Sequence, residues 1–370
     1  MDRSILLGCY EVPGYGGAST ATYQLFQLMR RDNLLVSFVN LIDGNDAAYY
    51  RYTFGQEFGN PDQASDTYNF IFDGPLYDPH PKLAGFLKAI SPDVIIGVDA
   101  IAMLLLKRES PETKSVFMTT GCRTMQDLMS ADLSKDFITH LALLRSDPSK
   151  PQALNREELT AVELADLVVT HSDSVHSLYD YFYPDHSGKL LADTIWFAEW
   201  IYGEALKYSH LSRPFSERAI EVLFIASSWA RFEKNYGLVR QIVRQLNSSR
   251  VHIVGSVATQ VPGAVFHGFE PVRRNVFDLI GQAKTVVCPS LFDAAPGILF
   301  EAAALGCNVI ASRNCGNWQL CNNELLVERF SLAEFMAKIA LSLTREFRPN
   351  INPFLEKRGY LTLLETLAVI

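Results

Sequence analysis

The chain has 370 residues, 48% of them hydrophobic, and its 33 lysines and arginines against 41 aspartates and glutamates give a formal net charge of −8. This length and apolar content predict two domains, each with its own core. The acidic balance argues against nonspecific nucleic-acid binding, which depends on Lys and Arg meeting phosphates. No apolar run in the sequence reaches the roughly 18 residues that a membrane-spanning helix requires.

Short apolar segments alternate with segments of helical period along the whole chain. The apolar segments are continuous and rich in β-branched residues, which is typical of strands covered on both faces of a parallel sheet. This alternation predicts an α/β fold with two Rossmann-like, doubly wound domains that face each other across a cleft. The expected strands are residues 4–10, 34–42, 93–98, 115–120, 166–171, 220–227, 251–256, 264–269, 285–290, 308–312 and 324–327, and the expected helices include 18–31, 234–246, 272–283, 297–306 and 331–344.

The alternation pauses at residues 199–218, where Pro, Ser and mixed charge suit a connection between domains. We therefore predict an N-terminal domain over 1–200 and a C-terminal domain over 201–350. Residues 351–370 are expected to form a helical tail that packs back on the N-terminal domain.

Residues 43–80 and 120–150 are predicted to be loops of the first domain. Their aromatic side chains would either stack on a bound ligand or pack into the core, as aromatic residues do more often. These aromatic residues are Tyr49, Tyr50, Tyr52, Phe54 and Tyr77.

The cysteines and histidines show no metal-binding spacing. None of the six cysteines forms a CxxC pair, and the eight histidines include no HExxH motif. We expect reduced cysteines in a cytoplasmic protein and no metal site.

Three glycines follow the first predicted strand in "EVPGYGGAST", residues 11–20. Gly14, Gly16 and Gly17 lie where a helix begins, and backbone without Cβ atoms at a helix N-terminus suits a closely bound anion. A glycine-rich turn without any function is the alternative.

Two cations precede a predicted helix in the segment "FIASSWARFEKNYGLVRQIVRQL", residues 224–246. Arg231 and Lys234 beside a helix N-terminus would hold a diphosphate well. The alternative is a solvated pair of cations balanced by Glu233.

Two acids lie eight residues apart in "TVVCPSLFDAAPGILFEAAALGCNVIAS", residues 285–312. This segment is predicted to run strand, loop, helix, strand, with Pro296 and Gly297 at the helix start. The free amides there make an anion site. Glu301 could accept hydrogen bonds from both hydroxyls of a ribose, and Asp293 could do the same for a second polyol. An ordinary capped helix with an acidic first turn is the alternative.

All three segments follow strand ends in the same order, and the chain here resembles the GT-B glycosyltransferases, specifically the family 4-like retaining group. The matching features are "PGYGG", "EKN", "VHIVGS", "ADLVVTHSDS" at 165–174, and the Asp293–Glu301 spacing followed by "AAALGCNVIAS".

The resemblance implies that the N-terminal domain, 1–200, binds the acceptor and that the C-terminal domain, 201–350, binds the nucleotide-sugar donor. Acceptor recognition would lie in 43–80 and 120–150, where stacking of the aromatic residues on a sugar acceptor is one alternative.

The resemblance also implies a role for each residue of the three segments. Glu301 would hold the nucleotide ribose, Asp293 the hydroxyls of the donor sugar, and Lys234 the diphosphate. The remaining contacts to the diphosphate would come from Arg231, from the amides of Gly297 and Ile298, and from Gly16 and Gly17 of the first domain.

Three positions depart from the family pattern. Trp229 stands where the family has an arginine, and Asp293 is one methylene shorter than the usual glutamate. Gly121 and Cys122 lie where a histidine is often found. Arg231 could replace the missing arginine from a shifted loop.

From the resemblance we expect a retaining, hexosyltransferase-like glycosyltransferase that uses a UDP- or GDP-sugar and needs no metal or further cofactor. Its acceptor would be a hydroxyl of a glycan, a small molecule or a lipid-linked sugar, and attachment to the inner membrane surface is left open. The alternatives are a nucleotide-sugar epimerase of GT-B shape and a nucleotide-sugar-binding protein without transfer activity.

Overall fold

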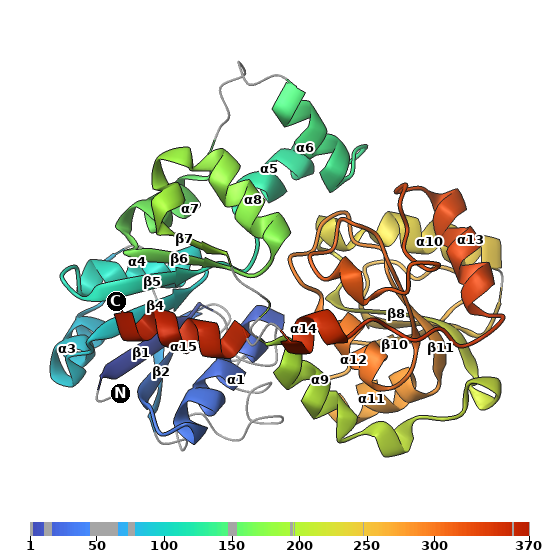
Figure 1. Ribbon diagram of the computed structural model, residues 1–370, viewed down its shortest axis with the longest axis horizontal. Coiled ribbons are helices and arrows are strands. Elements are labelled where there is room, and N and C mark those ends of the chain that lie inside the picture. The colour runs from blue at the N-terminus through green and yellow to red at the C-terminus, as the bar shows by residue number, and fades with distance from the viewer. Residues whose placement is uncertain are drawn as a thin grey trace. The chain divides into compact units, whose positions relative to one another are not determined.

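Every strand pairing in the described residues is parallel, and the strands form two separate sheets. The computed structural model (Figure 1) describes residues 3–10, 17–44, 66–72, 78–146, 154–192, 195, 197–246, 248–356 and 359–369. The prediction of two doubly wound α/β sheets is confirmed.

The chain divides into two units, each built around one sheet. The first unit comprises residues 1–124, 153–194 and 359–370, and the second comprises 125–152 and 195–358. The sequence predicts a boundary near residue 200, whereas the structure assigns 125–152 to the second unit and begins that unit's main segment at Ile195.

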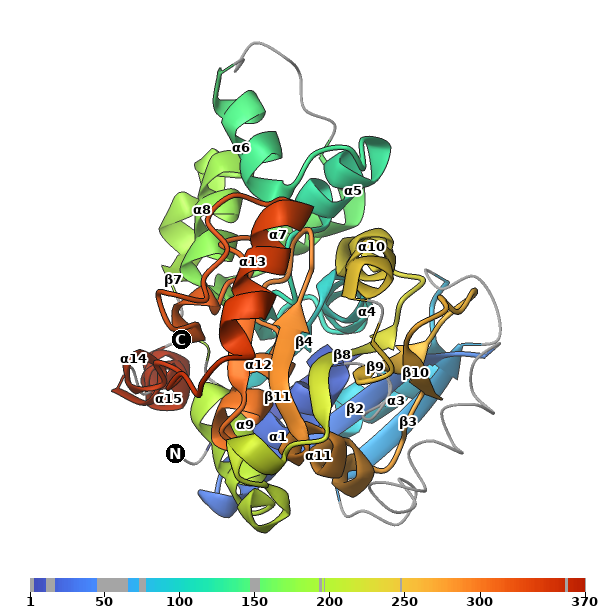
Figure 2. The same ribbon diagram turned by 90° about the vertical axis from the view of Figure 1, so that its right-hand side faces the viewer.

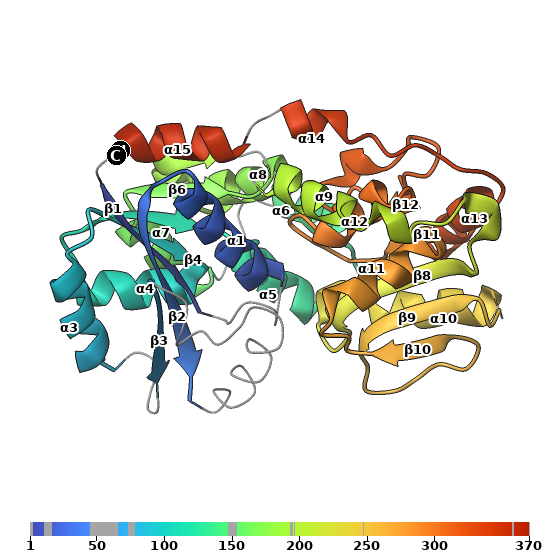
Figure 3. The same cartoon turned by 90° about the horizontal axis from the view of Figure 1, so that it is seen from below.

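The first unit has a seven-stranded sheet in the order β3-β2-β1-β4-β5-β6-β7. Figure 3 shows α3 and α4 on one face of this sheet and α1 on the other. The strands are β1 (Ser4–Cys9), β2 (Leu35–Asp43), β3 (Thr67–Phe72), β4 (Val94–Val98), β5 (Lys114–Met118), β6 (Leu167–Thr170) and β7 (Leu190–Ala192). Its helical elements are α1 (Gly17–Arg31), α3 (Pro81–Ile90), α4 (Ala100–Glu109), α7 (Arg156–Leu164), α8 (Asp173–Phe182), the 3₁₀ helix η2 (Pro184–Lys189) and α15 (Gly359–Val369).

The second unit has a five-stranded sheet in the order β10-β9-β8-β11-β12. Its strands are β8 (Ile220–Ser228), β9 (Val251–Ser256), β10 (Val265–Gly268), β11 (Ala283–Cys288) and β12 (Asn308–Ala311). Its α-helices are α6 (Phe137–Ser146), α9 (Ala198–Leu206), α10 (Tyr236–Leu246), α11 (Arg273–Gly281), α12 (Gly297–Ala304), α13 (Leu332–Ser342) and α14 (Asn352–Glu356), while α5 (Arg123–Ala131) spans the boundary between the units. Its 3₁₀ helices are η3 (Ser209–Leu211), η4 (Phe215–Glu217), η5 (Phe232–Lys234) and η6 (Trp318–Leu320).

The helices of the second unit cover both faces of its sheet, with α10 and α13 on one face and α9, α11 and α12 on the other (Figure 2). The face under α10 and α13 holds the main core of the unit, because both helices turn an apolar stripe towards the strands. Its fully buried members include Val222, Phe224, Val239, Ile242, Phe335 and Ile339.

Four segments differ from the predicted elements. Residues 324–327 form no strand, since Val327 makes only an isolated bridge to Ser312 while its leucine neighbours fill the core. β3 lies within 43–80 and the helices α5 and α6 lie within 120–150, so the prediction of loops is wrong for these parts. The connection at 199–218 contains most of α9 and the two 3₁₀ helices η3 and η4.

The C-terminal helix α15 belongs to the first unit. Arg3 at the start of the chain donates a hydrogen bond from Nη1 to the backbone oxygen of Leu367 at 3.4 Å. None of the helices in the described residues is long and apolar enough to cross a membrane.

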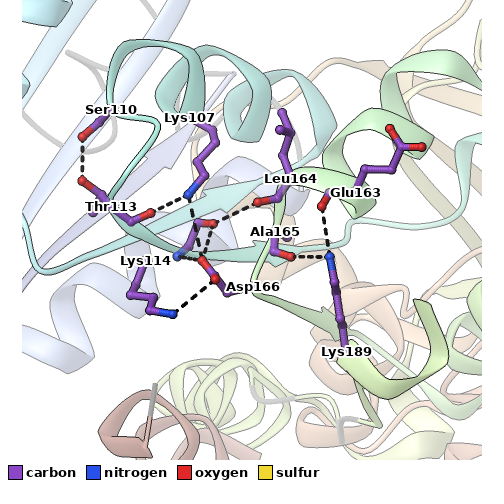
Figure 4. A network of polar contacts seen from close by, with 10 residues as sticks. Lys107, Ser110, Thr113, Lys114, Glu163, Leu164, Ala165, Asp166 and Lys189 are labelled. Atoms are coloured by element: carbon purple, nitrogen blue, oxygen red, sulfur yellow. Dashed lines mark hydrogen bonds and ion pairs between the residues drawn. The ribbon is translucent and has the colours of Figure 1, made fainter. Parts of the chain in front are cut away.

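A polar network joins α4, the end of α7 and the starts of β5 and β6 (Figure 4). The Asp166 carboxylate accepts a hydrogen bond from the backbone N–H of Ser115 at 2.9 Å and lies 3.5 Å from Lys114 Nζ. Lys189 donates to two carbonyl oxygens at the end of α7, both at 3.0 Å. Because ligand sites of parallel sheets form at the opposite, carboxyl ends of the strands, we assign this network a structural role.

A buried carboxylate fixes the chain where it leaves β5. Glu158 on α7 is 1% exposed, and its two oxygens accept four hydrogen bonds of 2.7–2.9 Å. Burial and the adjacent carboxylate raise the pKa of both tyrosines that donate to it, so they remain proton donors. The four donors are the backbone N–H groups of Arg123 and Thr124 and the hydroxyls of Tyr179 and Tyr183.

We expect Glu158→Ala to lower the free energy of unfolding of the first unit by about 3 kcal/mol, because it removes the acceptor of four hydrogen bonds, three of which are buried. The neighbouring Glu157, which pairs with Arg123 at 3.0 Å on the surface, is the matched control, and its alanine variant should cost about 0.5 kcal/mol. Urea titration of both variants measures the difference, and equal losses would contradict the role given to Glu158.

Candidate functional site

The predicted site residues of the second unit lie at the carboxyl ends of two paired strands. β8 and β11 run parallel, with Leu223 opposite Val286, so their following loops emerge at the same edge of the sheet. From β8 the strand order runs to one side through β9 to β10, and then to the other side through β11 to β12. Ligands of open α/β sheets usually bind where the strand order reverses in this way.

Two hydrogen bonds to backbone oxygens join these two loops. The N–H of Leu291 donates to the oxygen of Glu233 at 2.8 Å, and Asn235 Nδ2 donates to the oxygen of Pro289 at 3.2 Å. Asn235 has a left-handed backbone, with φ 57°, which Asn adopts more readily than most residues. Its Oδ1 accepts from the N–H of Leu238 and so caps the start of α10.

A third loop, which follows β12, fixes the backbone of Asp293 from the other side. The N–H of Asp293 donates to Asn314 O at 3.1 Å, and its oxygen accepts from Gly316 N at 2.8 Å. The buried Asn317 donates from Nδ2 to the oxygen of Pro296 at 3.0 Å. Asp293 and the start of α12 are therefore held by main-chain and amide contacts before any ligand binds.

Lys234 and Asp293, 59 residues apart in sequence, form an ion pair. The lysine side chain is 21% exposed and the aspartate side chain 13%. Burial alone would lower the pKa of Lys234, but the Asp293 carboxylate outweighs that effect and the pKa is raised above its ordinary value. The site therefore keeps a protonated lysine, already paired with the acid predicted to contact the donor sugar.

Arg231 pairs with Glu233 at 2.5 Å and its side chain is half-exposed. This geometry supports the alternative of a solvated, balanced cation for Arg231, but not for Lys234. Trp229 is buried, and its indole N–H donates to the oxygen of Val254 at 2.9 Å. The position of the family's arginine is thus occupied by a core residue that reaches the neighbouring strand β9.

Helix α12 presents its N-terminus directly after this loop. Pro296 precedes the helix and provides no side-chain cap, so the amides of Gly297 and Ile298 begin a turn with the positive end of the helix dipole. A Cβ at position 297 would lie 3.1 Å from Ile201, so packing against α9 also favours the glycine. Glu301 lies one turn further along.

Glu301 has a cationic partner that spacing in the sequence does not reveal. Arg273 Nη2, at the start of α11, lies 3.0 Å from Glu301 Oε1. The two residues are 28 positions apart on different helices, and no local motif connects them.

The structure thus brings Lys234 into contact with Asp293 and places Gly297, Ile298 and Glu301 on the helix that follows. Gly17 begins α1 of the first unit. Gly16 and the aromatic residues at positions 49, 50, 52, 54 and 77 lie outside the described residues.

The thiols of two buried cysteines lie in the same unit. Cys288 Sγ, at the end of β11, is 3.7 Å from Cys315 Sγ, and Cys315 forms an isolated bridge with Asp293. No group of three or more His, Cys, Asp or Glu is arranged to hold a metal ion in the part of the chain that the structure describes.

Solved structures with the same fold include the following three. Anabaena HepE in complex with UDP-glucose has a TM-score of 0.65 at 14% identity, over 99% of this chain and 100% of that one. Sucrose-phosphate synthase from Thermosynechococcus elongatus has a TM-score of 0.62 at 16% identity, over 98% and 94% of the two chains. The lipopolysaccharide outer core galactosyltransferase WaaB has a TM-score of 0.62 at 12% identity, over 99% of both chains. These likenesses define the class of the fold as GT-B.

A sequence match in the second unit adds to this assignment of the fold. Residues 219–345 match the family model described as "Glycosyl transferases group 1". Fold and family match together make the chain a glycosyltransferase, which confirms the expected enzyme class. A comparison with curated protein sequences finds no match.

We expect Asp293→Asn to make Lys234 more reactive towards amine-acylating reagents, because the substitution removes the main charge that opposes the lowering of the Lys234 pKa by burial and by Arg231. Each unit of lowered pKa raises the deprotonated fraction about tenfold below that pKa. Mass spectrometry after brief labelling at pH 8 measures the rate, with the exposed Lys207 as internal control. An unchanged rate at Lys234 would show that Asp293 does not control its charge.

Proposed function

We propose that the protein transfers a sugar from a nucleotide diphosphate sugar, with UDP or GDP as the nucleotide, to an acceptor hydroxyl with retention of configuration. The observation that carries this proposal is the Lys234–Asp293 pair at the carboxyl ends of β8 and β11, followed four residues later by the N-terminus of α12. The HepE structure supports the donor class, since that protein is in complex with UDP-glucose.

The leaving group of such a transfer is a nucleoside diphosphate, whose negative charge grows as the bond from the sugar C1 to the phosphate oxygen breaks. Lys234 and the amides of Gly297 and Ile298 are the groups proposed to stabilise that charge. They do so without reorganisation, because the loops that carry them are hydrogen-bonded to each other. On this proposal the step needs no metal and no cofactor beyond the donor.

Asp293 has a double part in the proposal. In the unliganded protein it neutralises Lys234. When a diphosphate approaches, the lysine gains a second anionic partner, and a carboxylate oxygen becomes available to accept from the hydroxyls of the donor sugar. Glu301 is proposed to accept from the ribose hydroxyls.

The bond that forms joins C1 of the sugar to the acceptor oxygen, and the acceptor proton leaves with the diphosphate. Retention is inferred from the sequence resemblance to family 4-like enzymes. The proposed acceptor is a hydroxyl of a glycan, a small molecule or a lipid-linked sugar.

We expect Lys234→Ala and Glu301→Ala each to lower transfer by about 100-fold or more, as the loss of a preorganised charge-stabilising group does in other enzymes. Lys207→Ala, which removes an exposed lysine of the same unit, is the matched control and should retain activity. Circular dichroism verifies the fold of each variant. Near-normal turnover in both site variants would refute the proposed roles.

The products separate the alternatives. Incubation with a UDP- or GDP-sugar and a candidate acceptor yields a glycosylated acceptor if the proposal holds. An epimerised donor would identify an epimerase, and binding without either product would identify a nucleotide-sugar-binding protein. A thermal-shift panel of UDP-, GDP-, ADP- and CMP-sugars selects the donor beforehand, since a ligand that binds only the folded state raises Tm.

A further inference from the structure

We infer that Arg273 is a positioning residue that orients Glu301 towards the ribose hydroxyls and thereby sets the preference for ribonucleotides over 2′-deoxyribonucleotides. The inference rests on the proposed function, because it assigns the ribose of the donor to Glu301.

The contact between the two residues is direct and partly shielded from water. Arg273 Nη2 lies 3.0 Å from Glu301 Oε1, with the arginine side chain 32% exposed and the glutamate side chain 15% exposed. A hydrogen bond between two charged groups at this distance is stronger and more directional than a neutral one. It therefore restricts the rotamers of a glutamate that would otherwise be free to turn.

The guanidinium is itself held in place. Its central carbon lies 5.2 Å from the ring centroid of Phe277, one turn further along α11. Phe277 is 1% exposed and stacks on Tyr208, with ring centroids 4.4 Å apart and planes at 22°. A cation over a locked aromatic ring gains electrostatic attraction and loses freedom, so Arg273 offers Glu301 a fixed partner.

Only one oxygen of the carboxylate is used by this contact. Oε1 meets Arg273, whereas Oε2 has no hydrogen-bond or ion-pair partner among the described residues. A carboxylate has about four acceptor positions, so a pair of vicinal hydroxyls can bind to Oε2 and the remaining position of Oε1. Arg273 therefore fixes the orientation of the carboxylate that would bind those hydroxyls.

The pair also balances charge. A bare carboxylate near a diphosphate would repel it, and Arg273 removes that repulsion. This second effect would act equally on ribose and deoxyribose nucleotides, so the ratio of the two affinities separates positioning from charge balance.

The test measures dissociation constants of the full-length protein for UDP, GDP and ADP and for their 2′-deoxy forms. We expect the unchanged protein to prefer the ribonucleotide, and Arg273→Ala to reduce that preference about tenfold, the size of one charged hydrogen bond. Arg273→Lys should restore part of the preference. Arg274→Ala is the matched control, because Arg274 is an exposed neighbour on the same turn and should leave the ratio unchanged.

An unchanged ratio in Arg273→Ala and in Arg273→Gln would overturn the inference and leave the proposed function intact. The glutamine variant keeps most of the stem and covers the case in which the alanine variant does not fold. Equal affinity of the unchanged protein for both nucleotide forms would also overturn it. Failure of the unchanged protein to bind any of the three nucleoside diphosphates would count against the proposed function itself.

Discussion

A largely buried lysine can stay charged only beside an anion, and the pairing of Lys234 with Asp293 imposes that condition on the second unit. The lysine comes from the loop after β8 and the aspartate from the loop after β11, so the pair forms only if both loops take one conformation. The hydrogen bonds from Leu291 to Glu233 and from Asn235 to Pro289 provide it. The charge state of the site thus depends on the conformation of these two loops, and the loops lie together because β8 and β11 are neighbours in the sheet.

The other cations of the site are paired with acidic residues in the same way as Lys234. Each cation identified at the site has an acidic partner, with Arg231 on Glu233, Lys234 on Asp293 and Arg273 on Glu301. On the proposed function, a diphosphate would meet a nearly neutral set of side chains, and the field that attracts it would come from the amide end of α12 and from a lysine that can take a second anionic partner. Such a site discriminates through geometry more than through net positive charge.

The strands and the loops of the site differ in how far the sequence could predict them. The largely apolar segments such as 220–227 and 251–256 are strands, because helices cover both faces of the sheet and favour apolar side chains there. The equally apolar "ELLV" is not a strand, since its leucines are buried by a loop rather than by sheet pairing. An apolar segment therefore predicts that its side chains are buried, but not whether a sheet or a loop buries them.

The charged contacts show the same limit. The sequence predicts the balance of Arg231 by Glu233 as one alternative, because the two residues are neighbours in the chain. It does not predict the partner of Glu301, because Arg273 lies on another helix. Trp229 stands in the place of a family arginine and shows no functional signature in its sequence neighbourhood. Its hydrogen bond to Val254 identifies it as part of the core.

The division of the chain constrains how the protein can be dissected. The backbone passes from one unit to the other after Thr124, Gln152, Thr194 and Arg358. A single cut therefore releases no fragment that consists of one unit alone, and a cut near the middle of the chain would separate α15 from the rest of the first unit and α6 from the rest of the second. Residues 359–370 belong to the same unit as β1, so neither unit is continuous in sequence and each is assembled from segments that the other unit interrupts.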